Sequence, residues 1–245
     1  MPVGQRVARG GHRGKPLSGA DGQLHVGNSG PASKGEAASD TLTTLEGVLR
    51  NLGRVRLLTA GETLTRAGDA DGAMWQIIDG GADLLAPLTY GGSVVLDRAL
   101  PGAWLGATAA IEGAAALFTA TAVGTTTARR VDGVVLRATL SAQPSLWPGI
   151  LAIQQAEARA LIEMAGETLA LSARARILRR LLRLTAHREE VCVTQSALGE
   201  MVGTTRTTVH RILKAAENDG LVSLGYGAIR LQDRRAVEAA AAIDE

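Results

Sequence analysis

Residues 193–231, VTQSALGEMVGTTRTTVHRILKAAENDGLVSLGYGAIRL, decide the fold of the C-terminal part of this chain. Thr194 is placed to cap a helix in which Leu198 and Val202 share one inward face. Gly203 then supplies a tight turn before a second helix. Two helices joined by so short a turn are typical of a helix-turn-helix motif that reads DNA.

The second helix, which we expect to start near Thr204 or Thr205, has a buried and an exposed face. Val209, Ile212 and Leu213 recur at helical spacing and predict the buried face. The outward set is polar or basic, and it consists of Arg206, Thr207, His210, Arg211 and Lys214. Because the N-terminal residues of a recognition helix meet base edges in the major groove, the first four of this set are predicted to read bases.

A second group of side chains is placed to contact DNA phosphates, which position a protein without reading sequence. This group consists of Thr194, Gln195, Thr205 and Lys214. For Thr194 and Thr205 the alternative role is structural, because each stands where a helix needs an N-cap.

Two short strands are predicted at residues 221–223 and 228–231, and the glycines around Tyr226 make the tight connection of a wing. Turn, second helix and hairpin arrive in the order of a winged helix-turn-helix. The alternative is a small helical pair with a solvated basic face.

Charge along the 245 residues is uneven, although the net charge is only +2. Residues 173–232 carry ten Lys and Arg against five Asp and Glu, whereas residues 41–172 carry nine against twelve. The basic charge therefore coincides with the predicted DNA-reading motif, as neutralisation of phosphates requires.

The single cysteine, Cys192, cannot form an intramolecular disulfide, and the N-terminus lacks the charged-then-apolar pattern of a signal peptide. No apolar run reaches the length of a membrane span. We therefore expect a soluble protein of the cytoplasm with no membrane partner.

Residues 1–40 are rich in Gly, Ser, Ala and Arg and contain scarcely any large apolar side chains, which predicts a disordered arm. Its basic residues are candidates for weak, non-specific contacts with nucleic acid, and the alternative is a solvated tail.

Glycine-containing turns break residues 52–140 every eight to twelve residues, with short apolar runs such as 74–78, 94–96 and 134–136 between them. This spacing predicts an all-β barrel or sandwich. We place this β-domain at residues 41–144 and the DNA-binding domain at residues 172–245.

A long helix and a hinge are predicted over residues 145–171, with breaks at Gly166 and at residues 171–173. The residues expected to face a second copy of the helix in a dimer are Ile150, Ile153, Ala156, Ala160 and Met164. Packing of the same stripe on the chain's own barrel is the alternative. Pairing of DNA readers across two half-sites favours the dimer.

In this order, barrel, long helix, hinge and winged helix-turn-helix resemble the CRP/FNR family of bacterial transcription regulators over roughly residues 45–232. The likeness is strongest in residues 205–213, TRTTVHRIL, which follow the family's pattern Ser-Arg-Glu-Thr-Val-x-Arg-Ile-Leu. The resemblance implies an α+β fold: an N-terminal cyclic-nucleotide-binding-like β-barrel (jelly roll), a long dimerisation helix and the C-terminal winged helix-turn-helix.

The family's two base-reading arginines are kept as Arg206 and Arg211, but Thr207 replaces the glutamate between them. The resemblance implies that both arginines contact guanine, each bidentate contact being worth about 1–3 kcal/mol of discrimination. The DNA half-site should therefore be related to that of the catabolite activator, one of the proteins after which the family is named, but not identical to it.

The resemblance also implies a cyclic-nucleotide pocket, whose ligand-binding segment corresponds to residues 101–123 here. In the family, a glutamate near the start of this segment and an arginine near its end hold the ribose and the cyclic phosphate. Ala107 stands at the glutamate position and Phe118 at the arginine position, so a buried cyclic phosphate would lack its bidentate partner. Residues 150–167 also contain no Ser or Thr to contact adenine. We expect a degenerate pocket at Trp104, Leu105, Gly106, Ala107, Leu117, Phe118 and Thr119, and we do not expect cyclic AMP as the ligand.

Other sensing chemistry is not expected either, because an iron-sulfur cluster needs several cysteines and the barrel holds no histidine or cysteine for haem. The open alternatives are an unfamiliar ligand in a rebuilt pocket, a ligand bound elsewhere, and a filled pocket with constitutive DNA binding, which we favour. We predict no cofactor and no metal site.

The sequence thus predicts a homodimeric, sequence-specific regulator that binds double-stranded DNA at a pseudo-palindromic site, with RNA polymerase as a further candidate partner. The alternative is a sensor module that binds a small molecule or protein through the barrel and DNA only weakly. An enzyme is not predicted, because no catalytic arrangement or phosphate-cradling loop stands at proper spacing.

Overall fold

The computed structural model describes residues 31–70, 72–186 and 188–242, and side chains from residue 40 onward. The first thirty residues of the predicted arm and His187 lie outside the described residues. The N-terminal elements are α1 (Pro31–Leu52), β1 (Arg54–Leu58), β2 (Thr63–Thr65), β3 (Ala73–Asp79), β4 (Ala82–Pro87), β5 (Ser93–Ala99), β6 (Trp104–Leu105), α2 (Ala107–Glu112), β7 (Thr119–Ala122), β8 (Thr126–Asp132) and α3 (Gly133–Ala142). They are followed by a 3-10 turn (Pro144–Leu146), α4 (Trp147–Ala170), α5 (Ala173–Leu184), β9 (Glu190–Cys192), α6 (Gln195–Met201), α7 (Arg206–Asn218), β10 (Val222–Leu224), β11 (Ala228–Leu231) and α8 (Arg234–Ala242).

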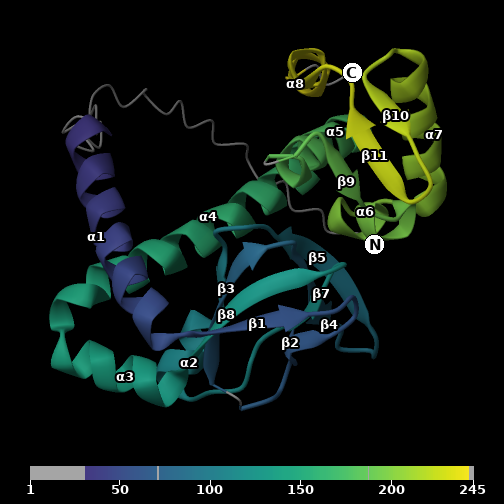
Figure 1. Cartoon of the computed structure of the whole chain (residues 1–245). Helices are drawn as coiled ribbons and strands as arrows, with labels where there is room; N and C mark the ends of the chain where they lie inside the picture. The colour runs from purple at the N-terminus through teal and green to yellow at the C-terminus, as the bar shows by residue number, and fades with distance from the viewer. Residues whose placement is uncertain (1–30, 71, 187, 243–245) are drawn as a thin grey trace, which may run out of the picture.

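Two antiparallel four-stranded sheets form the N-terminal barrel, in the orders β1-β8-β3-β6 and β2-β7-β4-β5 (Figure 1). Inward side chains of both sheets meet in one apolar core around Trp75, Ile77 and Leu105, with small residues such as Ala120 from the facing sheet. Together with the long helix and the C-terminal domain, this barrel confirms the predicted α+β fold class.

Gly80 lies in the turn between β3 and β4 at φ +81°, and a Cβ there would stand 2.6 Å from the carbonyl oxygen of Thr125. Gly80→Ala therefore combines a left-handed backbone with a backbone clash, and we expect it to lower the free energy of unfolding by at least about 2 kcal/mol. Gly91→Ala is the matched control, because φ is +95° there but nothing lies within 4 Å of the added Cβ. Urea unfolding of both variants checks this, and equal losses would show that the clash contributes nothing.

Two of the predicted segments have a different structure. Residues 31–40 belong to helix α1, so the predicted disordered arm is wrong for these ten residues. Their alanines favour helix, and Pro31 suits a first helical position. The apolar run 134–136, predicted as a strand, lies in α3, where Leu136 is buried and Val134 is exposed, as on the two faces of a helix.

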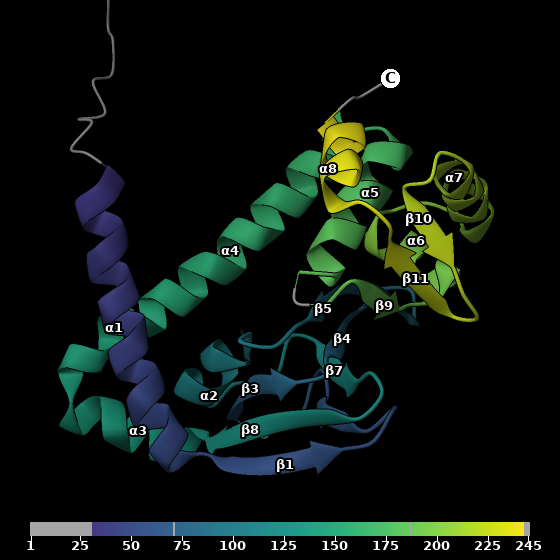
Figure 2. The ribbon, with the colours of Figure 1, turned by 45° about the horizontal axis from the view of Figure 1, so that its top comes forward.

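Helix α4 runs from the barrel to the C-terminal domain, and α1 packs across only its first half (Figure 2). It is continuous through Gly166, so the predicted break there is wrong; the chain leaves the helix at Leu171, whose backbone is extended. Ser172 then caps α5 by accepting a hydrogen bond from the backbone N–H of Ala175. The junction between the domains is therefore at residues 171–172.

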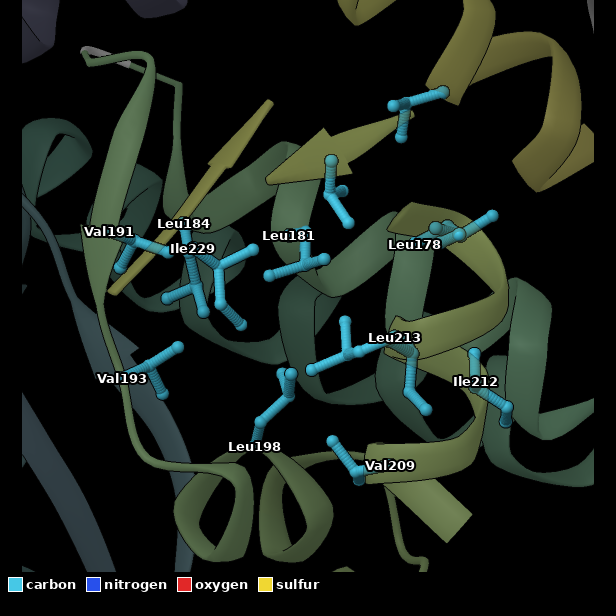
Figure 3. Close-up of a cluster of buried hydrophobic side chains, with 14 of the residues drawn as sticks. Leu178, Leu181, Leu184, Val191, Val193, Leu198, Val209, Ile212, Leu213 and Ile229 are labelled. Atoms are coloured by element: carbon cyan, nitrogen blue, oxygen red, sulfur yellow. The ribbon is translucent and has the colours of Figure 1, made fainter. Parts of the chain in front are cut away.

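The C-terminal domain is built on one apolar cluster, to which α5, α6, α7 and the small sheet all contribute (Figure 3). Its sheet has the order β10-β11-β9. Strand β9, which the sequence did not predict, pairs antiparallel with β11 through Val191 and Ile229, both buried in the cluster. The wing is thus the edge of a three-stranded sheet and not an isolated hairpin.

None of the helices within the described ranges combines the length and hydropathy needed to cross a bilayer.

Candidate nucleic-acid interface

Helices α6 and α7 meet at a close crossing, which the sequence explains. A Cβ on Gly199 would lie 2.8 Å from the carbonyl oxygen of Thr204, so the turn requires glycine at this position. Gly203 adopts φ +65°. Thr194 and Thr205 cap α6 and α7 by accepting hydrogen bonds from the backbone N–H groups of Ala197 (3.1 Å) and Thr208 (3.2 Å). The structural role considered for both threonines is therefore present, and a phosphate contact from either stays a prediction.

The predicted base-reading residues share the exposed face of α7. Val209, Ile212 and Leu213 are buried on the opposite face, as predicted. The exposed residues are Arg206, Thr207, His210, Arg211 and Lys214, and Gln195 is half-buried at the start of α6. Within the described part of the chain neither arginine forms an ion pair, so both guanidinium groups are free to bind a ligand.

Lys214 differs from the two arginines, because its ammonium is paired with Glu217 at 2.7 Å. The other carboxylate oxygen of Glu217 accepts a hydrogen bond from the backbone N–H of Leu224 in β10, at 3.0 Å. In Figure 1 strand β10 runs alongside α7. At the tip of the wing, Tyr226 is fully exposed and Gly227 adopts φ +71°.

The C-terminal domain is docked on the barrel along strand β5. Arg180 of α5 is 2% exposed and pairs with Asp97 of β5, and burial lowers the pKa of this guanidinium while Asp97 opposes the shift. Arg98 binds Asp83 through two hydrogen bonds and donates a third, of 2.6 Å, to the carbonyl oxygen of Cys192. Glu200 of α6 accepts from the backbone N–H of Val95 at 2.9 Å. We call these contacts the docking face.

Asp97→Ala is expected to destabilise the docked protein by about 2–3 kcal/mol, because it leaves the buried Arg180 charge without its partner. The expected loss in the free energy of unfolding stays below that for a fully buried ion pair, since the Asp97 side chain is 40% exposed. Asp79→Ala is the matched control: it removes an interdomain ion pair with Arg188 in which both side chains are exposed, and a loss of under about 1 kcal/mol is expected. Urea unfolding measures both, and indistinguishable losses would contradict the special role of Arg180.

Four of the seven predicted pocket residues are divided between two apolar clusters. Trp104 and Ala107 pack into the cluster formed with α1, α3 and α4, whereas Leu105 and Phe118 belong to the barrel core. Leu117 is exposed.

The remaining pocket positions have structural partners. Gly106 caps α2 at φ +76°, with the carbonyl oxygen of Ala73 2.8 Å from the position of a Cβ. The hydroxyl of Thr119 accepts a hydrogen bond from the backbone N–H of Ala67 at 3.0 Å. A cleft of about 720 Å³ opens elsewhere, between barrel and C-terminal domain, and it is lined by Asp79, Arg98, Arg188 and Cys192 among others.

The five residues predicted to face a second copy are also divided. Ile150 and Ile153 are buried against α1 and α3 of their own chain, so for these two residues the structure has the alternative contact, packing on the chain's own barrel. Met164 is half-buried, and Ala156 and Ala160 are exposed. The stripe seen in the sequence is therefore, in its first half, the face that α4 turns to its own barrel.

Sequence reasoning missed the residues that connect elements far apart in the chain. Asp97 and Arg98 belong to a strand with no distinctive motif, and their partners in the C-terminal domain, Arg180 and Cys192, lie 83 and 94 residues away. Glu217 offered a local signal, since it stands three residues after Lys214 and faces the same side of a helix. Among the described residues, His, Cys, Asp and Glu side chains form no group of three that a metal ion could use.

A basic, exposed helix set on a helix-turn-helix and joined by a long helix to an antiparallel barrel defines a two-domain DNA-binding regulator. Two family models match the chain: a cyclic nucleotide-binding domain at residues 55–143 and a Crp-like helix-turn-helix domain at residues 175–240. Together they cover more than half of it. The chain belongs to the CRP/FNR family of transcriptional regulators.

Solved structures of the family share this fold. A transcriptional regulator of the CRP family from Thermus thermophilus is 21% identical, with a TM-score of 0.64 over 77% of this chain and 97% of that one. FixK2 from Bradyrhizobium japonicum is 18% identical, with a TM-score of 0.67 over 76% and 96%. The c-di-GMP responsive regulator CLP from Xanthomonas campestris is 21% identical, with a TM-score of 0.61 over 78% and 99%. A search of curated protein sequences finds no match.

Proposed function

We propose that this protein binds a pseudo-palindromic DNA site as a homodimer, in a sequence-specific manner and without cyclic AMP. The observation that carries the proposal is the pair of exposed guanidinium groups, Arg206 and Arg211, on the outer face of α7. Arginine presents two parallel donors to the O6 and N7 acceptors of guanine. Thr207 between them is short and uncharged, so it does not replace the cytosine contact that the family's glutamate makes.

A second, exposed stripe on α4 supports the homodimer. Leu151, Ile162 and Leu169 are 63%, 72% and 89% exposed. Alternating steps of four and three residues connect them with three further exposed residues, giving Leu151, Gln155, Ala158, Ile162, Ala165 and Leu169. This is the heptad spacing of a coiled-coil interface, and we call it the α4 seam. The α4 seam lies on the side of the helix opposite to Ile153, so the contact with the barrel and the contact with a second copy use different sides of α4.

Independence from cyclic AMP is supported by the residues that replace the family's ligand-binding glutamate and arginine. Ala107 is buried in the helix cluster and Phe118 packs on the barrel core. Neither position offers a donor for a ribose or a cyclic phosphate, and an anion buried there would have no charged partner. The fold accommodates other effectors, since CLP is described as responsive to c-di-GMP.

Selection of bound sequences from a random DNA library tests the proposal directly. We expect a two-fold symmetric site whose half-sites contain the guanines read by Arg206 and Arg211, with a base other than the catabolite activator's opposite Thr207. Addition of cyclic AMP should leave the affinity for the selected duplex unchanged. Recovery of the catabolite activator's consensus would contradict the role given to Thr207, and selection of no common sequence would favour a sensor module with weak DNA binding.

A further inference from the structure

Glu217, near the C-terminal end of α7, has both oxygens of its carboxylate engaged. One accepts a hydrogen bond from the ammonium of Lys214 at 2.7 Å, three residues earlier on the same helix. The other accepts from the backbone N–H of Leu224 in β10 at 3.0 Å. A single side chain therefore connects the basic face of the recognition helix with the wing.

The connection to β10 fixes the carboxylate in place. If Glu217 were bonded to Lys214 alone, the two side chains could move together over the helix surface. The backbone donor of Leu224 belongs to a strand that is paired with β11 on its other side, so Glu217 can follow Lys214 only by giving up this hydrogen bond. Lys214 can reach a DNA phosphate only by leaving or sharing its partner, and the negative charge then stays beside the DNA.

This arrangement separates Lys214 from the two arginines of the same face. Arg206 and Arg211 have no ion-pair partner within the described residues, whereas Lys214 does. The pKa of Glu217 is lowered by the hydrogen bonds from Lys214 and Leu224, so the carboxylate is ionised at neutral pH. The two arginines predicted to read bases are free, while Lys214, the one charged residue among the four predicted to contact phosphates, is neutralised before DNA arrives.

We propose that Glu217 is a positioning residue that restrains DNA binding by holding Lys214 away from the phosphate backbone while it joins the wing to α7. The inference rests on the proposed DNA-binding function. Phosphate neutralisation is the part of affinity that does not depend on sequence. The effect of Glu217 is therefore to weaken binding to any DNA duplex, whatever its sequence.

Glu217→Gln tests the inference, because glutamine keeps the oxygen that accepts from Leu224 but removes the charge that holds Lys214. The probe is a random-sequence DNA duplex, bound by the full chain and followed by fluorescence anisotropy over a series of KCl concentrations. We expect the slope of log K against log salt to steepen by about 0.9 for each Lys214 that engages a phosphate, and binding at low salt to tighten roughly 3- to 10-fold. A purely structural role would leave the slope unchanged.

The double variant Lys214→Gln/Glu217→Gln identifies the route of the effect. If Glu217 acts through Lys214, the second substitution adds no gain to Lys214→Gln. Glu238→Gln is the matched control, because it removes the same charge from an exposed residue of α8. It should keep the wild-type slope.

Three outcomes would overturn the inference. A wild-type slope in Glu217→Gln, with wild-type DNA binding intact, overturns it and leaves the proposed function standing. A gain that persists without Lys214 does the same, because the lysine would then not be the restrained group. Failure of the wild type to bind any duplex overturns the proposed function and the inference together. Thermal unfolding of each variant establishes that it is folded under the conditions of the binding measurement.

Discussion

The double variant Arg206→Ala/Arg211→Ala is expected to bind its selected site no better than random DNA. Each bidentate arginine–guanine contact contributes about 1–3 kcal/mol of discrimination, so the pair accounts for a loss of roughly 30-fold to 20,000-fold in the ratio of specific to non-specific affinity. Both side chains are exposed on α7, and the buried face of that helix is untouched, so the fold should be preserved. Competition binding with selected and random duplexes measures the ratio.

Arg235→Ala is the matched control for this experiment. It removes one positive charge from the same domain, at an exposed position of α8. It should lower both affinities slightly and leave their ratio unchanged, since general phosphate attraction carries no sequence information. If the double variant also kept its ratio, base reading by α7 would be wrong, and the alternative of a sensor with weak DNA binding would gain support.

The helix-turn-helix was predictable because its determinants are local. The spacing of Leu198, Val209 and Leu213 identifies the buried faces, and Gly199 and Gly203 stand where the backbone crossing and the turn require them. Strand β9 was not predictable in this way. It has only three residues, of which one is buried, and its pairing with β11 joins residues about forty positions apart.

The two apolar stripes of α4 show where periodicity stops being informative. One contains Ile150 and Ile153, the other Leu151 and Ile162, and both repeat at helical spacing. Tertiary contacts distinguish them, because α1 and α3 cover the first stripe and leave the second exposed. The α1 residues that cover the first stripe, Leu45 and Leu49, lie in a segment that was placed in the β-domain from the sequence, without a helix predicted there. The docking face depends in the same way on contacts between remote segments.

Ile162→Glu is expected to turn the proposed dimer into monomers. Ile162 occupies the middle of the α4 seam and is 72% exposed within one chain. Burying an isoleucine contributes about 1.5–3 kcal/mol, and a symmetric dimer loses two such contacts while two carboxylates are brought together. We therefore expect dimerisation to weaken by at least about 3 kcal/mol, or more than a hundredfold. Sedimentation equilibrium over a range of protein concentrations measures the change.

Ala160→Glu is the control that separates the two interfaces considered for α4. Ala160 is exposed and belongs to the set predicted from the sequence, but in the heptad of the α4 seam it lies on the far side of the helix. The seam predicts a dimer of unchanged stability for Ala160→Glu, and dissociation by this variant alone would return the interface to the face first predicted. The monomer formed by Ile162→Glu should still contact one half-site through Arg206 and Arg211. It should lose the preference for a symmetric site, because two recognition helices held about one DNA turn apart require the dimer.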